Sequence, residues 1–369
     1  MHLETLLDEP EFNLPAVNTS GDPFVLFAEQ RIELYIRLLT ASFSDLFTNS
    51  PPKILDFREF METVTEFGRG LLSVIRVANS MNPHLAYPQF KVLMDKMGFL
   101  VSGYPASLFF LEPMQCFFRC KHFPGDLKAQ DWFFHTGFHL RSVVTPTRFT
   151  PAGLPALYLT NALAVGYEEL RAAEPDGFQA VKLKTKSNVR RSLLDLDYTR
   201  PLSALRATNQ EEYDLQLQFK GLLYPLLLCC FTQRNGGGAA PPEYIVPQYL
   251  LRWVMESPFY SGIKFPSTRT RSAHFQGNFY NLVIPPIEVL DTGYCPKLKN
   301  MFLISDVCGF TEHAAAIDGY YTDNFAPLTR VNPEVESIDW QSRLEIYDTS
   351  DLGRMEFYLK NQPVVPIPF

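Results

Sequence analysis

The residues that could do chemistry in this chain fall into three groups, the first being a pair of histidines. His135 and His139 lie four positions apart, and on a helix this spacing would put both imidazoles on one face, where they could bind a metal ion. No H-E-x-x-H motif accompanies them, Gly137 interrupts the segment, and further ligands would have to come from far away. We therefore expect packed or surface histidines and no metal.

The second group would contain a nucleophilic serine or cysteine. The sequence has no G-x-S-x-G elbow, no glycine-rich phosphate loop, and no cysteine in a recognisable catalytic context. Cys229 and Cys230 lie in the apolar run 222–231, where a thiol behaves as a small hydrophobe. The absence of a C-x-x-C pair favours a reduced, cytoplasmic setting.

The third group is a dispersed set of polar side chains, namely Arg119, Arg148, Tyr158, Glu169 and Ser267. Taken singly, each is more often structural, because an arginine usually makes a surface pair and a strand tyrosine usually packs in a core. Their order and their local contexts, however, match one family.

From Cys116 to Pro285, about half of the chain, the sequence resembles the RES domain, a family named for an Arg, a Glu and a Ser. In chain order the matching pieces are Phe117-Phe-Arg119, Thr147-Arg-Phe-Thr-Pro-Ala-Gly-Leu-Pro-Ala-Leu-Tyr-Leu159, the helix 161–170 with its acidic end, Tyr244-Ile-Val-Pro-Gln-Tyr-Leu250, Gly262-Ile-Lys-Phe-Pro-Ser267 and Asn281-Leu-Val-Ile. Each piece is short, but all of them occur in the order of the family pattern and at plausible spacings along the chain.

The resemblance implies both a fold and an activity. RES proteins are similar in fold to ADP-ribosyltransferases and diphtheria-type toxins, and they cleave the nicotinamide–ribose bond of NAD with water or inorganic phosphate as acceptor. Bacterial members are commonly toxins neutralised by an antitoxin. For this chain the resemblance implies NAD as substrate, phosphate as a candidate co-substrate, no bound cofactor, and an antitoxin or immunity protein as partner.

The five carried-over residues suit this reaction. Glu169 would stabilise the oxocarbenium-like ribose that forms as the bond breaks. Arg119 and Arg148 would hold phosphate or ribose groups with their guanidinium forks. Tyr158 would stack on the nicotinamide ring, and Ser267 would bond the ribose or orient the carboxylate.

The chain departs from the family pattern in several places. Thr147 and Thr150 stand where the pattern favours Gly and Asn, and an insertion at about 174–240 follows the acidic helix. Glu168 could exchange roles with its neighbour Glu169, although the interval from Tyr158 favours Glu169.

Helices are expected to dominate the first hundred residues. Apolar residues recur at three- and four-residue steps over 27–46, 57–74 and 90–97, which predicts three helices. Beyond them we expect strands at 107–111, 116–119, 154–159 and 262–267, and helices at 162–172, with Asn161 as N-cap, and at 213–231. The segment 244–255 is expected to begin as a strand and continue as a helix.

We therefore predict an α+β protein. It would have an N-terminal helical region (1–105), a mixed-sheet, ADP-ribosyltransferase-like RES core (106–290) carrying the insertion, and a C-terminal extension (291–369). The basic stretch 182–191 is expected to be a solvated loop, with phosphate binding as the alternative. A flexible loop is expected at 234–242.

Composition and charge narrow the class of protein. Apolar residues make up 46% of the chain, enough for a folded core, and the formal net charge of -7 argues against nucleic-acid binding. The acidic start lacks the regions of a signal peptide, and the run 222–231 is too short to span a membrane. We expect a soluble, cytoplasmic protein, acting in its own cell or in a target cell, and either monomeric or a homo-oligomer.

Two other functions stay open. An ADP-ribosyltransferase that modifies a macromolecule would share the fold and the carboxylate chemistry. The second open function is that of a catalytically inactive interaction module with the same fold. Such a module would need none of the five candidate residues.

Overall fold

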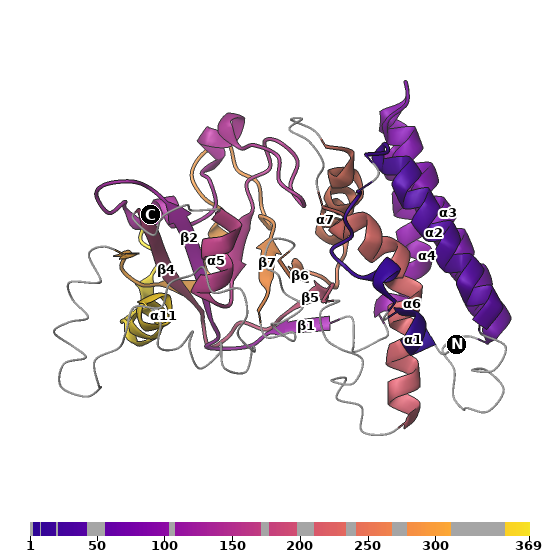
Figure 1. Ribbon diagram of the computed structural model, residues 1–369. Helices are drawn as coiled ribbons and strands as arrows, with labels where there is room; N and C mark the ends of the chain where they lie inside the picture. Colours follow the sequence, from indigo (N-terminus) through magenta and orange to yellow (C-terminus); the bar gives the residue numbers. More distant parts are fainter. Residues whose placement is uncertain are drawn as a thin grey trace. The chain divides into compact units, whose positions relative to one another are not determined.

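The computed structural model describes residues 3–7, 9–19, 21–42, 56–102, 108–170, 177–197, 210–233, 241–267, 279–310 and 351–369. The chain divides into two compact units, each assembled from segments that are distant in sequence (Figure 1). Unit 1 comprises Met1–Phe109, Thr145–Gly153 and Leu194–Tyr260, and unit 2 comprises Phe110–Val144, Leu154–Leu193 and Ser261–Phe369. The domain limits predicted from the sequence stay a prediction.

Unit 1 is built from helices. They are α1 (Leu3–Leu7), α2 (Phe24–Ser42), α3 (Phe57–Ala78), α4 (Ala86–Ser102), α6 (Gln210–Phe231) and α7 (Ile245–Glu256), with 3-10 turns η1 (Pro10–Phe12), η2 (Pro83–Leu85) and η7 (Pro242–Tyr244). Helix α3 starts with a capping box between Asp56 and Glu59 and contacts α2, α4, α6 and α7. The predicted helices are confirmed where they are described; residues 43–55 and 234–240 lie outside the described ranges.

The prediction of a strand at the start of 244–255 is wrong. Residues Pro242–Tyr244 form a 3-10 turn, and α7 begins at Ile245. Pro247 lies in the first turn of α7, where a backbone N–H would have no partner within the helix, so proline is tolerated there. Crossing a bilayer would need a longer and more apolar helix than any that the structure describes.

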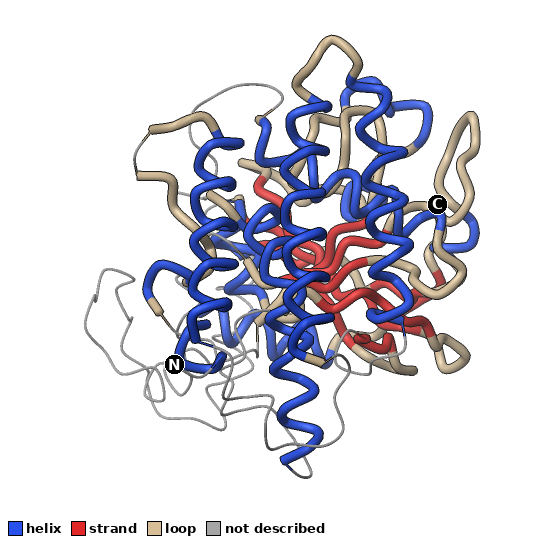
Figure 2. The backbone as a smooth tube through the Cα atoms, turned by 90° about the vertical axis from the view of Figure 1, so that its right-hand side faces the viewer, coloured by secondary structure: helices blue, strands red, loops and turns tan. Residues whose placement is uncertain are grey.

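The described strands join into one sheet, drawn in red in Figure 2. They are β1 (Leu108–Leu111), β2 (Cys116–His122), β3 (Leu157–Thr160), β4 (Phe178–Thr185), β5 (Arg191–Asp195), β6 (Ile263–Phe265), β7 (Asn281–Ile284), β8 (Phe302–Ile304), β9 (Cys308–Gly309) and β10 (Val365–Pro366). The order is β1-β5-β6-β7-β3-β2-β4-β8-β10, with β9 beside β4, and the pairs from β6 to β10 along this order are antiparallel. The α+β class is confirmed, and the ADP-ribosyltransferase-like core stays a prediction.

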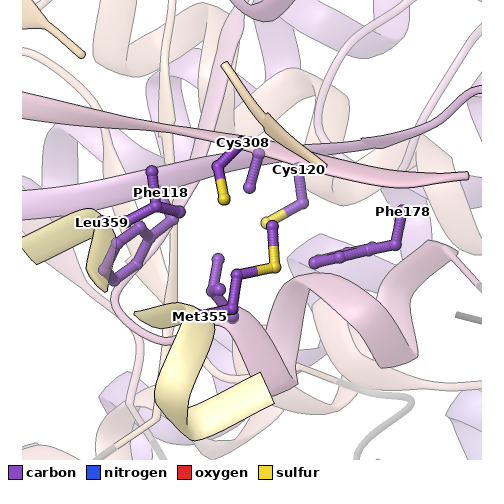
Figure 3. Packing of buried hydrophobic residues seen from close by; sticks show 8 residues of the cluster. Phe118, Cys120, Phe178, Cys308, Met355 and Leu359 are labelled. Carbon is purple, nitrogen blue, oxygen red and sulfur yellow. The ribbon is translucent and has the colours of Figure 1, made fainter. Parts of the chain in front are cut away.

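Helices α5 (Leu163–Leu170) and α11 (Asp351–Asn361) pack against strands β2 and β4 of unit 2. The core between them contains aromatic, aliphatic and sulfur-bearing side chains (Figure 3): Phe118, Cys120, Leu163, Phe178, Ala180, Cys308, Met355 and Leu359. Phe118 and Cys120 are two residues apart on β2 and therefore point to the same face of the sheet. Helix α11, from the predicted C-terminal extension, thus shares a core with α5.

Short elements complete unit 2. They are the 3-10 turns η4 (Gln130–Phe133) and η5 (Phe138–Val143) and the helix α8 (Pro296–Lys299). All six cysteines of the chain are free thiols.

The prediction that 182–191 is a solvated loop is wrong for its first part. Lys182 and Lys184 lie on β4, and Lys182 is only 2% exposed. The Lys182 Nζ donates a hydrogen bond to the carbonyl of Lys360 at 2.9 Å and another to the carbonyl of Gln362. These carbonyls lie at the C-terminal end of α11, where a cation is favoured, so the charge that suggested solvent is satisfied inside the fold.

Replacing Lys182 with Met should lower the free energy of unfolding by about 1–3 kcal/mol, because the α11 carbonyls lose their charged donor. Lys184→Met, at a half-buried lysine on the same strand, is the matched control and should change it by less than about 0.5 kcal/mol. Chemical denaturation measures both. Equal stability of the two variants would contradict the capping role of Lys182.

Candidate functional site

Glu169 lies near the end of α5 among buried polar groups. Its Oε1 accepts a hydrogen bond from Ser267 Oγ at 2.5 Å and another from Asn281 Nδ2 at 3.1 Å. Ser267, which follows β6, is 1% exposed, and Asn281, which begins β7, is 7% exposed. Glu169 itself is half-buried, whereas the adjacent Glu168 is exposed.

These contacts bring together two of the five candidate residues, Glu169 and Ser267, across 98 positions of sequence. Two donors on a single carboxylate oxygen fix the rotamer of Glu169 and leave Oε2 outside these two bonds. A carboxylate fixed in this way can stabilise a positive charge that develops next to it.

Asn281 belongs to this arrangement but was missed as a site residue. The sequence offered one signal, because Asn281 is the polar first residue of the apolar run that closes the resemblance. On the sheet it pairs with Thr160 of β3 and with Phe265 of β6. The strand therefore places Asn281 between the segment that leads into α5 and the segment that leads to Ser267.

Tyr158 shares a sheet face with Asn281. Residues that pair directly across antiparallel strands point to the same side, as do residues two apart on one strand. Thr160 pairs with Asn281, and Tyr158 lies two residues before Thr160. The register thus directs Tyr158 to the face from which Asn281 reaches Glu169.

Arg119 lies where β2 and β3 stop pairing. The described register between these strands holds the pair Phe118–Thr160, and one residue further Arg119 Nη1 donates to the backbone carbonyl of Tyr158 at 3.1 Å. Arg119 Nε is buried and has no hydrogen-bond partner among the described residues. Burial lowers the pKa of Arg119, whereas the neighbouring Cys120 and Tyr158 raise it by a smaller amount. The arginine nonetheless stays charged.

Arg148 belongs to unit 1, so the structure describes it separately from the other four candidates. Its Nη1 donates to the carbonyls of Cys230 at 2.7 Å and of Thr232 at 3.1 Å, at the C-terminal end of α6. Its guanidinium also lies 5.4 Å from the centre of the Tyr244 ring. These contacts give Arg148 a structural role at the end of α6, where a cation is favoured.

The turn that carries Arg148 contacts the Pro-Gln segment. Gln248 Nε2 donates to the carbonyl of Thr147 at 2.9 Å and to that of Thr150 at 3.2 Å. The hydroxyls of these two threonines are 2.6 Å apart. The residues that depart from the family pattern therefore form a hydrogen-bonded turn, and two motif pieces a hundred residues apart meet in unit 1.

Helix α5, which carries Glu169, is held closely at two points. A Cβ atom added to Gly166 would lie 2.4 Å from Cys120 Sγ and 2.9 Å from Cys120 Cβ, so only glycine allows this approach to β2. At the start of α5, Leu163 N–H donates to Glu356 Oε2 at 2.7 Å. Glu356 is 6% exposed and pairs with Lys360 at 2.7 Å.

Glu356 was missed by sequence reasoning because it lies on α11, 193 residues from Leu163, and nothing in its local sequence marks it. Asn161 was predicted to cap this helix, and its Oδ1 accepts a hydrogen bond from the backbone N–H of Tyr280 at 2.8 Å. The carboxylate that accepts the N–H of Leu163, the first residue of α5, belongs to Glu356. Its negative charge at the N-terminus of the helix is favoured by the helix dipole.

His135 and His139 do not share a helix face. His135 is buried before η5, and its Nε2 accepts a hydrogen bond from Cys295 N–H at 2.9 Å, so Nδ1 carries the proton that it donates to the Thr136 carbonyl at 2.8 Å. His139 is exposed. Within the described ranges, no three His, Cys, Asp or Glu side chains gather in a way that could hold a metal ion.

The chain is similar in sequence to a protein named as a toxin. A Bacillus subtilis (strain 168) protein named "Putative toxin YopC" is 25% identical over 370 residues, covering 94% of this chain and 78% of that protein. No family model matches the chain, and no solved structure matches it.

Gly166→Ala tests how closely α5 must approach β2. Alanine gains about 1 kcal/mol of helix propensity, but the clash with Cys120 involves its fixed Cβ as well as Sγ, and overpacking costs about 1–3 kcal/mol. We expect a net loss of stability in denaturant unfolding. Glu168→Ala, at an exposed position of the same helix, is the control and should be close to neutral. A Gly166→Ala protein more stable than wild type would show that the contact tolerates a methyl group.

His135 predicts a stability that depends on pH. Burial lowers its folded-state pKa below the ordinary value of 6.5, so below about pH 6.5 the unfolded chain binds a proton that the folded chain does not. Stability should therefore fall as pH drops from 7 through the folded-state pKa. In His135→Gln this fall should be shallower, whereas His139→Gln should keep the wild-type profile. Identical profiles for the two variants, measured by denaturant unfolding at several pH values, would refute the assignment.

Proposed function

We propose that this chain is an NAD-degrading enzyme that cleaves the nicotinamide–ribose bond, with inorganic phosphate or water as acceptor, and that it acts as a toxin. The observation that carries the proposal is the pair of hydrogen bonds that Glu169 accepts from Ser267 and Asn281. The Glu and the Ser are the residue types for which the RES resemblance is named, and they meet although 98 positions separate them. The similarity to a protein named as a toxin supports the toxin role.

The chemistry follows from where charge develops. As the bond from C1′ of ribose to the nicotinamide nitrogen breaks, the electron pair leaves with nicotinamide, which becomes neutral. The ribose is left as an oxocarbenium-like cation, and Glu169 stabilises it electrostatically. An oxygen of phosphate, or of a water that loses a proton, then bonds to C1′, giving ADP-ribose phosphate or ADP-ribose together with free nicotinamide.

The other residues bind and orient. Ser267 and Asn281 keep the Glu169 carboxylate in one rotamer, which spares the cost of reorganising it during the reaction. For Arg119, binding of a phosphate or ribose group rests on the resemblance alone, because its side chain leaves β2 on the face opposite to Phe118 and Cys120, against which α5 packs. Tyr158 lines the nicotinamide side of the site. For Arg148, whose Nη1 bonds α6, contact with the substrate rests on the resemblance alone.

The partners follow from the activity. An enzyme that consumes NAD endangers any cell that contains it, so a cognate antitoxin or immunity protein that denies NAD access to Glu169 is part of the proposal.

The second candidate function is transfer of ADP-ribose to a macromolecule, which would use the same fixed carboxylate.

Glu169→Gln is the test of the proposed reaction. The amide keeps the size of the side chain but lacks the negative charge, so NAD loss and nicotinamide release should fall at least about 100-fold. Glu168→Gln, which removes a charge from the exposed neighbour, is the matched control and should stay within a few-fold of wild type. Purified protein is assayed with NAD, with and without phosphate.

The products separate the candidate functions. ADP-ribose or its phosphate as the product supports the proposed enzyme, and a labelled macromolecule supports the transferase. No turnover under either condition supports a silent module. Full activity in Glu169→Gln would remove the carboxylate from the mechanism.

A further inference from the structure

Helix α11 lies outside the part of the chain that resembles RES domains, yet it packs on the same side of the sheet as the proposed site. Met355 and Leu359 of α11 belong to the buried cluster on the face of Phe118 (Figure 3). Asn281 points to this face as well, because Phe118 pairs with Thr160 and Thr160 pairs with Asn281. Helix α11 and the donors of the candidate carboxylate therefore share one face.

A series of charged groups connects strand β4 to helix α5 through α11. Lys182 Nζ, on β4, donates to the carbonyls of Lys360 and Gln362. Lys360 Nζ lies 2.7 Å from Glu356 Oε1, one turn earlier on α11. Glu356 Oε2 accepts the Leu163 N–H at 2.7 Å. The two oxygens of this buried carboxylate thus have different partners, one on α11 and the other at the start of α5, and burial strengthens both interactions.

Helix α5 is short enough to depend on these contacts. It has eight residues, and a helix of this length gains little from its own hydrogen bonds and needs tertiary contacts to form. The first N–H groups of a helix have no partner within it, and Glu356 provides the acceptor for that of Leu163. Glu169 follows Leu163 by six residues, which is about 9 Å along the helix axis. A change at the start of α5 therefore reaches the turn that carries Glu169.

We propose that Glu356 is a positioning residue for the candidate site, because its carboxylate holds α5 where Ser267 and Asn281 reach Glu169. The consequence for catalysis rests on the proposed function, whereas the positioning itself holds whether or not NAD is the substrate. The C-terminal helix α11 is then required for full activity, although Glu356 touches no reacting atom. Glu356 is not part of the RES resemblance, so it adds a residue to the five carried over from it.

Hydrogen-exchange mass spectrometry of the full chain tests the positioning without any substrate. In Glu356→Leu the amides of residues 167–170, which include Glu169, should exchange about 10-fold faster or more, because α5 loses its acceptor and is held less firmly. Glu356→Gln keeps an oxygen that can accept the Leu163 N–H but lacks the charge, so its exchange should be intermediate. Faster exchange confined to the first turn of α5, with 167–170 as in wild type, would overturn the proposal.

Ile304→Val is the matched control for loss of stability. Ile304 is fully buried on β8 of the same unit, and it pairs with Leu183, which points to the sheet face opposite to Phe118. The substitution removes one methyl group from the core and lowers stability but leaves Glu356 in place. Exchange of residues 167–170 should therefore match wild type. If this variant speeds exchange there as much as Glu356→Gln does, general destabilisation explains the effect and the proposal fails.

Steady-state kinetics with NAD tests the consequence for the reaction. The kcat of Glu356→Gln should fall about 10-fold or more while KM stays within a few-fold, because the Glu169 carboxylate is displaced but the strands that carry Tyr158 and Asn281 stay paired. Ile304→Val should keep the wild-type kcat. A wild-type kcat in Glu356→Gln would overturn the positioning role and leave the proposed reaction intact. If the wild-type chain does not cleave NAD, the proposed function fails, and the exchange measurement alone decides the positioning.

Discussion

The proposed site depends on how closely helix α5 approaches strand β2. Gly166 faces Cys120 with no room for a Cβ atom, and one turn later on the same helix Glu169 meets Ser267 and Asn281. A helix displaced outward would move the carboxylate away from both donors, whose hydrogen bonds are strongly distance-dependent. The packing of a glycine on a cysteine is therefore coupled to the orientation of the carboxylate that would do the chemistry.

The same helix is supported by residues that have no motif of their own. Glu356 accepts the Leu163 N–H, and Lys182 donates to the carbonyls at the end of the helix that carries Glu356. Both charges are nearly removed from solvent, and each is satisfied at a helix terminus, where orphan backbone groups and the helix dipole favour it. In unit 2, buried charge serves to dock helices as well as to form a candidate site.

Much of the fold could be predicted from local sequence. The helices α2, α3 and α6 follow from apolar periodicity, and the strands β2 and β6 from short apolar runs. Two local predictions were wrong for physical reasons. The stretch 182–191 suggested a solvated loop, because the carbonyls that accept hydrogen bonds from Lys182 lie at the end of α11, far away in sequence. The start of α7 suggested a strand, but a helix forms there and tolerates Pro247 in its first turn.

The candidate site was predictable only in part. The resemblance named Glu169 and Ser267, and the structure joins them, but Asn281 could not be assigned because its role depends on the pairing of β7 with β3 and β6. Glu356 carried no signal, since it acts on a residue 193 positions away.

The hydrogen bond from Leu163 to Glu356 has a further consequence for biosynthesis. A ribosome must add another 193 amino acids after Leu163 before that amide finds its acceptor, so the nascent polypeptide carries every proposed catalytic side chain well before helix α5 is capped.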